Sequence, residues 1–234
     1  PATGAVALAP VQQWFFEQAI PERQHWNQSL LLVPRAALNV EALDRALAQL
    51  LIHHDSLRLR YQQTANGWQQ AYAAPTTESL LWQRQAQSVE ALSALCDEAQ
   101  RSIDLYNGPL LRALLVAMAD GSERLLLVIH HLAVDGVSWR VLLEDLQQFY
   151  SGHAAMAKTS TYQRWVARLQ EHLPAFENSL GQWQTQLQGA PTDLPCDRAH
   201  GALEHRFEHK LELRFDAEQT RKLLQQAPAA YRTQ

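Results

Sequence analysis

The chain has 234 residues, of which 47% are hydrophobic and 19% are charged, and its formal net charge is −4. This composition is typical of a globular protein with a substantial core, and it excludes a disordered chain. The 20 Lys and Arg residues form no basic run, so nucleic acid is not expected as a partner. No segment approaches the roughly 18–20 apolar residues that span a bilayer, so no membrane association is expected. Cys96 and Cys196 are expected to be free thiols, which favours a cytoplasmic protein.

Helices are predicted from apolar spacing and from capping residues such as Asn39 and Asp216. They cover residues 10–20, 39–55, 89–103, 136–152, 161–173, 175–188 and 216–227. A Pro- and Gly-rich connector is expected at residues 189–201. The chain lacks an initial Met and stops soon after the last helix, which suggests a piece of a longer protein.

Strands are predicted between these helices, at residues 25–34, 57–63, 68–74, 79–85, 109–119, 122–133 and 202–215. Asn66-Gly67 and Asp120-Gly121 are placed to turn two hairpins. The second hairpin is almost wholly apolar, which predicts central strands covered on both faces. The fold class is therefore α/β, with a mixed sheet and flanking helices.

The stretch HHLAVDGVSW, residues 130–139, carries the strongest candidate for chemistry. Successive residues on a strand point to opposite faces, so His130 and His131 could not both bind one metal ion without a sharp bend. No metal is expected here. The same argument applies to His53-His54-Asp55, where a histidine at a helix end has the simpler role of bonding the last carbonyl groups.

General acid/base chemistry fits this stretch better, because histidine exchanges protons near neutral pH. One histidine is expected at the mouth of the strand and the other in the packing. Asp135 could return to the histidine or pair with Arg58, since a buried carboxylate needs a partner. Gly136 would allow a tight turn into a helix beginning near Ser138, whose amides could face a bound carbonyl. The alternative is a satisfied polar plug at the strand end, and the pattern alone leaves both open.

Other chemistry has little support in the sequence. There is no nucleophile elbow and no Gly-rich phosphate loop, and nucleophilic catalysis by Cys96 on a helix or by Cys196 in a connector is poorly supported. The seven Trp residues are spread along the chain and are expected in the core.

The motif and its continuation, HHLAVDGVSWRVLLEDL, resemble the HHxxxDG motif of nonribosomal peptide synthetase condensation domains, which share the chloramphenicol acetyltransferase-like α/β sandwich fold. The letters VSWR after Gly136 resemble the epimerization subtype, whereas condensation domains usually continue with Gly-Trp-Ser. Four further stretches resemble family motifs in the expected order: LAPVQQWFFEQ, HHDSLRLRY, LPCDRA and AYRTQ.

This resemblance implies that residues 1–234 are the N-terminal lobe of an epimerization domain. Residues 190–201 would be a connector and 202–234 the start of a crossover toward a second lobe, which this chain does not include. The substrate would be an aminoacyl or peptidyl thioester on the phosphopantetheine arm of a carrier protein, expected upstream in the same synthetase. No cofactor would be bound directly, and the product would be a mixture of L and D residues.

The resemblance also assigns roles to single residues. His131 would be the catalytic acid/base, and His130 would pack or orient. Asp135 would be structural with Arg58 as its partner, and Gly136 would lie close to the substrate arm. Ser138 and Trp139 are expected near the substrate. A proton donor for the opposite face of the substrate would be a Glu of the second lobe.

Three functions remain open on these grounds. The first is epimerization, and the second is peptide-bond formation by a condensation domain that uses the same His131. The third is a non-catalytic lobe that docks a carrier protein.

Overall fold

The structure is a computed structural model that describes residues 2–154, 157–191, 195–197, 201 and 207–232. The chain divides into two compact units, residues 1–180 and residues 181–234. The boundary falls inside one helix, ahead of the connector expected at 190–201, and much of that connector lies outside the described residues.

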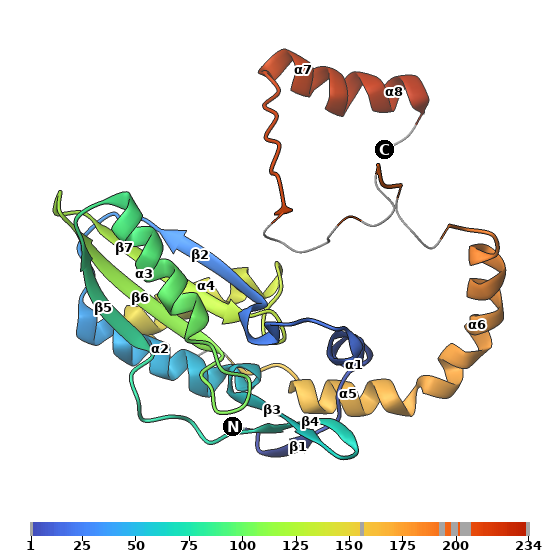
Figure 1. Cartoon of the computed structure of the whole chain (residues 1–234), viewed down its shortest axis with the longest axis horizontal. Coiled ribbons are helices and arrows are strands. Elements are labelled where there is room, and N and C mark those ends of the chain that lie inside the picture. The colour runs from blue at the N-terminus through green and yellow to red at the C-terminus, as the bar shows by residue number, and fades with distance from the viewer. Residues whose placement is uncertain (1, 155–156, 192–194, 198–200, 202–206, 233–234) are drawn as a thin grey trace. The chain divides into compact units, whose positions relative to one another are not determined.

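A four-stranded sheet forms the centre of the first unit (Figure 1). Its strands, in spatial order, are β2 (Asn27–Leu32), β7 (Glu123–His130), β6 (Leu111–Met118) and β5 (Leu81–Ala86). β5 pairs with β6 in parallel, and the other pairs are antiparallel. The sheet is therefore mixed, as predicted, and the apolar hairpin β6–β7 occupies its middle.

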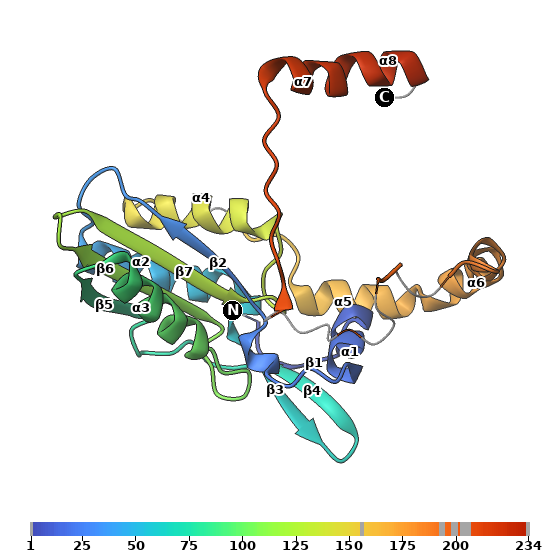
Figure 2. The same ribbon diagram turned by 45° about the horizontal axis from the view of Figure 1, so that its top comes forward.

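Helices cover both faces of this sheet, which explains why β6 and β7 are apolar on both sides (Figures 1 and 2). On β7, Leu127 and Ile129 pack in the cluster that contains the side chains of α2 (Val40–His53) and α4 (Ser138–Tyr150). The alternate residue Val128 packs in a second cluster, with α3 (Val89–Arg101). The strand's alternation thus assigns each residue to one of two cores.

A smaller antiparallel sheet lies in the same unit, in the order β1 (Gly4–Val6), β4 (Gly67–Tyr72) and β3 (Leu59–Thr64). The hairpin predicted at Asn66-Gly67 is confirmed, and Gly67 has the positive φ of 101° that glycine adopts without strain. β1 was not predicted, because three residues are too few to show an alternation.

The helices predicted at 10–20, 161–173 and 175–188 are present as α1 (Pro10–Glu17), α5 (Tyr162–Glu171) and α6 (Leu173–Leu187), and the last of these contains the boundary between the units. The short 3₁₀ turns η1 (Arg23–His25) and η2 (Asp55–Arg58) were not predicted. The predicted cap of α2 is confirmed, since the Asn39 side chain accepts a hydrogen bond from the Ala42 amide at 2.8 Å.

The second unit corrects one prediction. The strand expected at 202–215 is not a strand in its described part, residues 207–215. Alternation shows which faces a paired strand would present, but a strand forms only where it joins a sheet, and neither sheet of the described residues includes 207–215.

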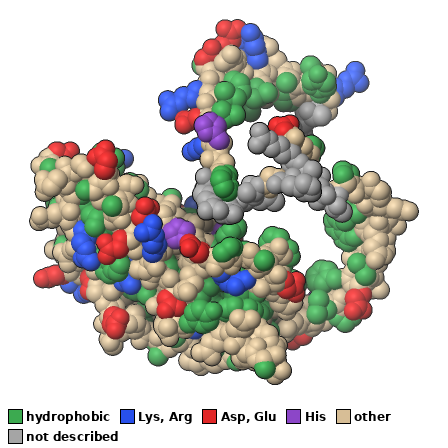
Figure 3. Space-filling view, viewed as in Figure 1, with side chains coloured by type: hydrophobic (Ala, Val, Ile, Leu, Met, Phe, Trp, Pro, Cys, Tyr) green, Lys and Arg blue, Asp and Glu red, His purple; other side chains and the backbone are tan. Residues whose placement is uncertain are grey.

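The helix expected at 216–227 is present as α7 (Ala217–Arg221), a π-helical turn at Lys222–Gln226, and α8 (Ala227–Tyr231). Asp216 caps it by accepting from the Gln219 amide at 2.7 Å. Figure 3 shows hydrophobic side chains beside acidic and basic ones on this helical segment, and Leu224 is 67% exposed. Among the described residues, no helix is both long and apolar enough to cross a membrane.

Helix α1 is fastened to the small sheet by a pair of buried amides. Gln12 Nε2 donates to Gln70 Oε1 at 3.1 Å, and Gln70 Nε2 donates to Gln12 Oε1 at 2.8 Å. Gln12 also accepts from the Ala9 amide at the start of the helix, at 2.9 Å. Loss of either amide would be costly, because a buried amide left without its partner has no water to bond to instead.

We predict that Gln70→Ala destabilises the protein by about 1–3 kcal/mol, because it leaves the buried Gln12 amide without its main partner. Urea unfolding measures the loss. The matched control is Gln69→Ala, on the exposed face of the same strand, which is expected to change stability very little. Equal losses in the two variants would contradict the anchoring role of the pair.

Candidate active site

The two histidines of the sequence motif lie at the end of β7, next to the beginning of β2. Asn27 pairs with His130 across the two strands, and the His131 amide bonds to the Trp26 carbonyl at 2.9 Å. The strand geometry therefore continues through both histidines. Their side chains leave on opposite faces, as the sequence predicts.

His130 is fully buried, with 0% of its surface exposed. Its Nε2 lies 2.9 Å from the Arg23 carbonyl, and its Nδ1 accepts from the Leu132 amide at 3.1 Å. A carbonyl only accepts and an amide only donates, so the neutral ring carries its proton on Nε2. Burial lowers the pKa of His130 to about 4, and both ring nitrogens are occupied. His130 is therefore a neutral structural side chain, and it touches the Phe15 ring edge-to-face.

His131 is exposed and stands beside a cavity. Its Nδ1 lies 2.8 Å from the Val134 carbonyl and its Nε2 lies 3.3 Å from Gln28 Nε2. Because the carbonyl requires a donor, Nδ1 carries the proton and Nε2 carries the lone pair. An imidazole in this form can accept a proton through Nε2.

The cavity beside His131 has a volume of about 600 Å³. Apolar side chains from α1, the residue before β2, the start of β3 and the loop after β7 form most of its wall. These lining residues include Val11, Trp14, Phe15, Trp26, Leu59 and Leu132. Tyr162 of α5 also lines it, and burial raises the pKa of this phenol to about 12. A cavity of this kind suits an organic chain with a reactive group held near His131.

Asp135 is exposed and caps the beginning of α4. Its Oδ1 accepts from the Val137 amide at 3.1 Å, from the Ser138 amide at 2.7 Å and from the Ser138 hydroxyl at 2.6 Å. The bonds from Ser138 hold the pKa of Asp135 below its usual value. The expectation that these amides face a bound carbonyl is wrong, because Asp135 occupies them.

The predicted pairing of Asp135 with Arg58 is also wrong. Arg58 is buried and its Nη2 lies 2.5 Å from Asp55 Oδ1, three residues earlier in the same 3₁₀ turn. Arg58 also donates to the carbonyls of Ala2 and Ala73. Burial raises the pKa of Asp55, but hydrogen bonds from Arg58, the Ala2 amide and Lys158 outweigh it and leave that pKa lowered. In a 3₁₀ turn, side chains three residues apart lie on the same side, so Asp55 is placed beside Arg58 by the local backbone.

The other residues predicted at the site fall into different surroundings. Ser138 lines the cavity, with its hydroxyl bonded to Asp135. Trp139 is 8% exposed, packs in the core beneath α4, and does not line the cavity. Gly136 has no positive φ, and a Cβ there would meet no described atom within 4 Å.

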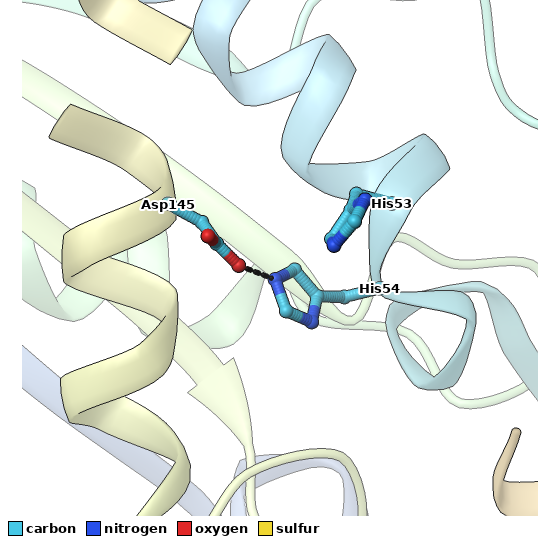
Figure 4. A group of neighbouring side chains, drawn as sticks. All are labelled: His53, His54 and Asp145. Atoms are coloured by element: carbon cyan, nitrogen blue, oxygen red, sulfur yellow. Dashed lines mark hydrogen bonds and ion pairs between the residues drawn. The ribbon is translucent and has the colours of Figure 1, made fainter. Parts of the chain in front are cut away.

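A second group of titratable side chains joins α2 to α4 (Figure 4). The ligand-type atoms of His53, His54 and Asp145 lie within 4.8 Å of one another among the described residues. His54 Nε2 contacts Asp145 Oδ2 at 2.7 Å, whereas Asp55 turns toward Arg58. Burial lowers the pKa of His54 more than the hydrogen bond and charge of Asp145 raise it, which favours the neutral imidazole. This bond links the end of one helix to the middle of another.

Sequence reasoning missed Asp145 and Gln28. Asp145 had a detectable signal, because it is a carboxylate at helical spacing among the buried residues Leu142, Leu146 and Phe149. Gln28 had none, because only the pairing of β2 with β7 brings it to His131.

Comparison with solved structures gives the class of the fold. The epimerization domain from the third module of tyrocidine synthetase B superposes with a TM-score of 0.88 at 32% identity, covering 100% of this chain and 56% of that one. The first condensation domain of the calcium-dependent antibiotic synthetase gives 0.67 at 21% identity, covering 80% and 48%. The first unit is thus a chloramphenicol acetyltransferase-like α/β sandwich.

The family follows from the sequence. The condensation domain family matches residues 2–234, and this chain belongs to it. Tyrocidine synthase 2 of Brevibacillus parabrevis is 33% identical over 246 residues, in an alignment that covers 99% of this chain and 7% of that synthase. A linear gramicidin synthase protein of the same organism is 38% identical over 250 residues, which cover 99% of this chain and 5% of the relative. The chain therefore spans a small part of the synthetases that it matches.

Substitution of the two aspartates near the site is expected to destabilise the protein by different amounts. Asp55→Ala leaves Arg58 buried without its charge partner, which typically costs about 3–5 kcal/mol. Asp135→Ala removes a helix cap, which typically costs about 1 kcal/mol. Chemical unfolding of both variants compares them directly. If Asp135→Ala lost as much stability as Asp55→Ala, the result would favour a pairing of Asp135 with Arg58 and contradict the arrangement described above.

The lowered pKa of buried His130 predicts that the stability of the protein depends on pH. Its folded-state pKa is lowered to about 4, so between the unfolded value near 6.5 and that value the unfolded chain binds more protons. The stability that His130 contributes by staying neutral is fully present above about pH 7. It decreases as the pH falls, and about 2 kcal/mol of it is lost by about pH 5.

The test compares the protein with His130→Gln, whose amide can still donate to the Arg23 carbonyl. The variant is expected to lose less stability between about pH 7.5 and pH 5 than the parent, by roughly 2 kcal/mol. Identical pH profiles of unfolding free energy would show that His130 is not held neutral.

Proposed function

We propose that this chain is part of an epimerization domain of a nonribosomal peptide synthetase. The substrate is an aminoacyl or peptidyl thioester, carried on the phosphopantetheine arm of a carrier protein. The reaction removes the α-proton and returns it from either face, which gives a mixture of L and D residues. His131 is the acid/base on one face of the α-carbon.

The observation that carries this proposal is His131 beside an apolar cavity with Nε2 as its unprotonated nitrogen. An α-proton next to a thioester is weakly acidic, so its removal needs a base held close to it and a site that restricts water. Neutral imidazole is such a base at physiological pH, and the imidazolium that forms can return the proton. His130 cannot share this work, because its two nitrogens are bonded inside the core.

The epimerization subtype is supported by two features. The residues after Gly136 are Val137, Ser138 and Trp139, which resemble the epimerization motif and differ from Gly-Trp-Ser. The likeness to the tyrocidine epimerization domain extends over the whole chain at 32% identity. The condensation domain of the calcium-dependent antibiotic synthetase shares only the fold.

Gly136 fits a position next to the substrate arm. Neither its φ nor its neighbours within the chain require glycine, and the space beside its Cα is open. A side chain there would extend into that space, so a group that approaches the backbone closely supplies a reason for glycine.

The second face of the α-carbon needs its own proton donor. This chain spans 56% of the solved tyrocidine epimerization domain. We assign the donor to a carboxylate of the other half of the domain. Activity is therefore tested in the full-length protein that carries this chain.

We predict that His131→Ala slows α-proton exchange by about 10²–10⁴-fold, because it removes the general acid/base. The measurement is uptake of deuterium at the α-carbon of an L-aminoacyl carrier protein in deuterated water, with the L and D products separated after hydrolysis. The matched control is His153→Ala, an exposed histidine of the same unit, which is expected to exchange at the parent rate.

If His131→Ala exchanged α-protons at the parent rate, the result would contradict the proposal and favour a non-catalytic lobe that docks a carrier protein. The condensation alternative is tested in the same preparation, by supplying donor and acceptor aminoacyl carriers together. Dipeptide formed without any α-deuterium uptake would assign the chain to peptide-bond formation.

A further inference from the structure

Trp139, Gln28 and His131 form a chain of side-chain hydrogen bonds that joins the core to the proposed base. The Trp139 Nε1–H donates to Gln28 Oε1 at 2.9 Å, and Gln28 Nε2 lies 3.3 Å from His131 Nε2. The residues come from three elements: α4, β2 and the end of β7 (Figure 1). Gln28 lies opposite Ile129, so its side chain leaves the sheet on the same face as His131.

The direction of each bond follows from which atoms can donate. An indole N–H only donates, so the Gln28 oxygen must face Trp139 and the Gln28 amide nitrogen must face His131. That nitrogen also donates only, so His131 Nε2 must accept. At the other side of the ring, the Val134 carbonyl lies 2.8 Å from Nδ1 and requires a donor there. Both ends of the network thus select the same tautomer.

We propose that Trp139 and Gln28 are positioning residues that hold His131 in its Nδ1–H tautomer and weaken the binding of a proton at Nε2. When Nε2 is protonated, its N–H faces the N–H of Gln28, and two donors cannot bond. Gln28 could relieve this contact by turning its amide over, but the carbonyl would then leave Trp139 Nε1. Because Trp139 is only 8% exposed, the loss of this bond from its indole N–H is costly.

The consequence for catalysis rests on the proposed function. A base that binds its proton weakly returns it readily, and an epimerase must return the proton in every turnover. The tautomer itself does not depend on any substrate, so it is tested separately from activity.

The charged and titratable groups around His131 stay the same in this test. Asp135 of the loop and His130 of β7 lie close enough to His131 to interact with it electrostatically, and Tyr162 of α5 lines the same cavity. Variants at Gln28 and Trp139 leave all three in place, so a change in His131 reports on the amide and the indole.

The experiment is ¹⁵N NMR of the histidine-labelled chain across a pH series, with His131 assigned by its absence in His131→Gln. In the parent, we expect Nδ1 protonated and Nε2 unprotonated at high pH. Trp139→Phe removes the donor that fixes Gln28, together with part of the buried ring, and is expected to raise the proton affinity of His131 by about fivefold, the equivalent of one hydrogen bond. Gln28→Glu places a carboxylate beside Nε2 and is expected to raise it by roughly tenfold or more.

Two control variants carry the same substitutions elsewhere: Trp82→Phe and Gln83→Glu on β5. Both are expected to leave the His131 titration unchanged. A parent protonated on Nε2 instead of Nδ1 overturns the proposal. So do folded Trp139→Phe and Gln28→Glu proteins that titrate like the parent. If Trp139→Phe fails to fold, Gln28→Glu decides alone, together with Gln28→Met, which removes the opposing donor and is expected to raise the proton affinity.

The proposed function can fail independently. If the tautomer and its response are as described but His131→Ala still exchanges α-protons, the network stands and the epimerase assignment falls. If His131→Ala is inactive and the tautomer does not respond, the base stands without its positioning residues.

Discussion

The pairing of β2 with β7 is the constraint on which the site depends. Its register places Asn27 opposite His130 and Gln28 opposite Ile129. One histidine must then point into the core and the next must point toward the cavity, because the strand alternates. A shift of the register by one residue would exchange the two side chains. The apolar hairpin β6–β7 holds that register, since both of its faces are packed against helices.

The residues after β7 continue this division of work. His130 uses both ring nitrogens to tie the strand end to backbone groups, and Asp135 uses its carboxylate to begin α4. Between them, His131 has one nitrogen bonded to the backbone and one beside a neighbouring amide. The motif thus contains two structural side chains that fix the geometry of a third. The proposal that His131 acts as the acid/base rests on this arrangement.

Local patterns were enough to predict most of the fold. Asn66-Gly67 turned a hairpin, Asn39 and Asp216 capped helices, and the apolar run of β6 and β7 marked the central strands. The separation of the histidines also followed from the strand alone. Alternation misled at residues 207–215, because a strand needs a partner that no local pattern supplies.

Contacts between distant residues were harder to predict. Arg58 was assigned to Asp135, yet Asp55 stands three residues away in a 3₁₀ turn and takes the ion pair. Gln28 looked like an ordinary polar strand residue until the register placed it at His131. Both errors concern partner choice, which depends on the tertiary arrangement more than on residue type.

The central claim is that the exposed His131 serves as the acid/base, whereas the buried His130 has only a structural role. Carbethoxylation with diethyl pyrocarbonate, mapped by tandem mass spectrometry, tests it in the unaltered full-length protein, because the reagent needs an accessible ring nitrogen. The account predicts modification at His131 well before His130, with α-proton exchange lost in step with residue 131. Equal modification of both histidines, or full exchange after His131 is modified, would contradict it.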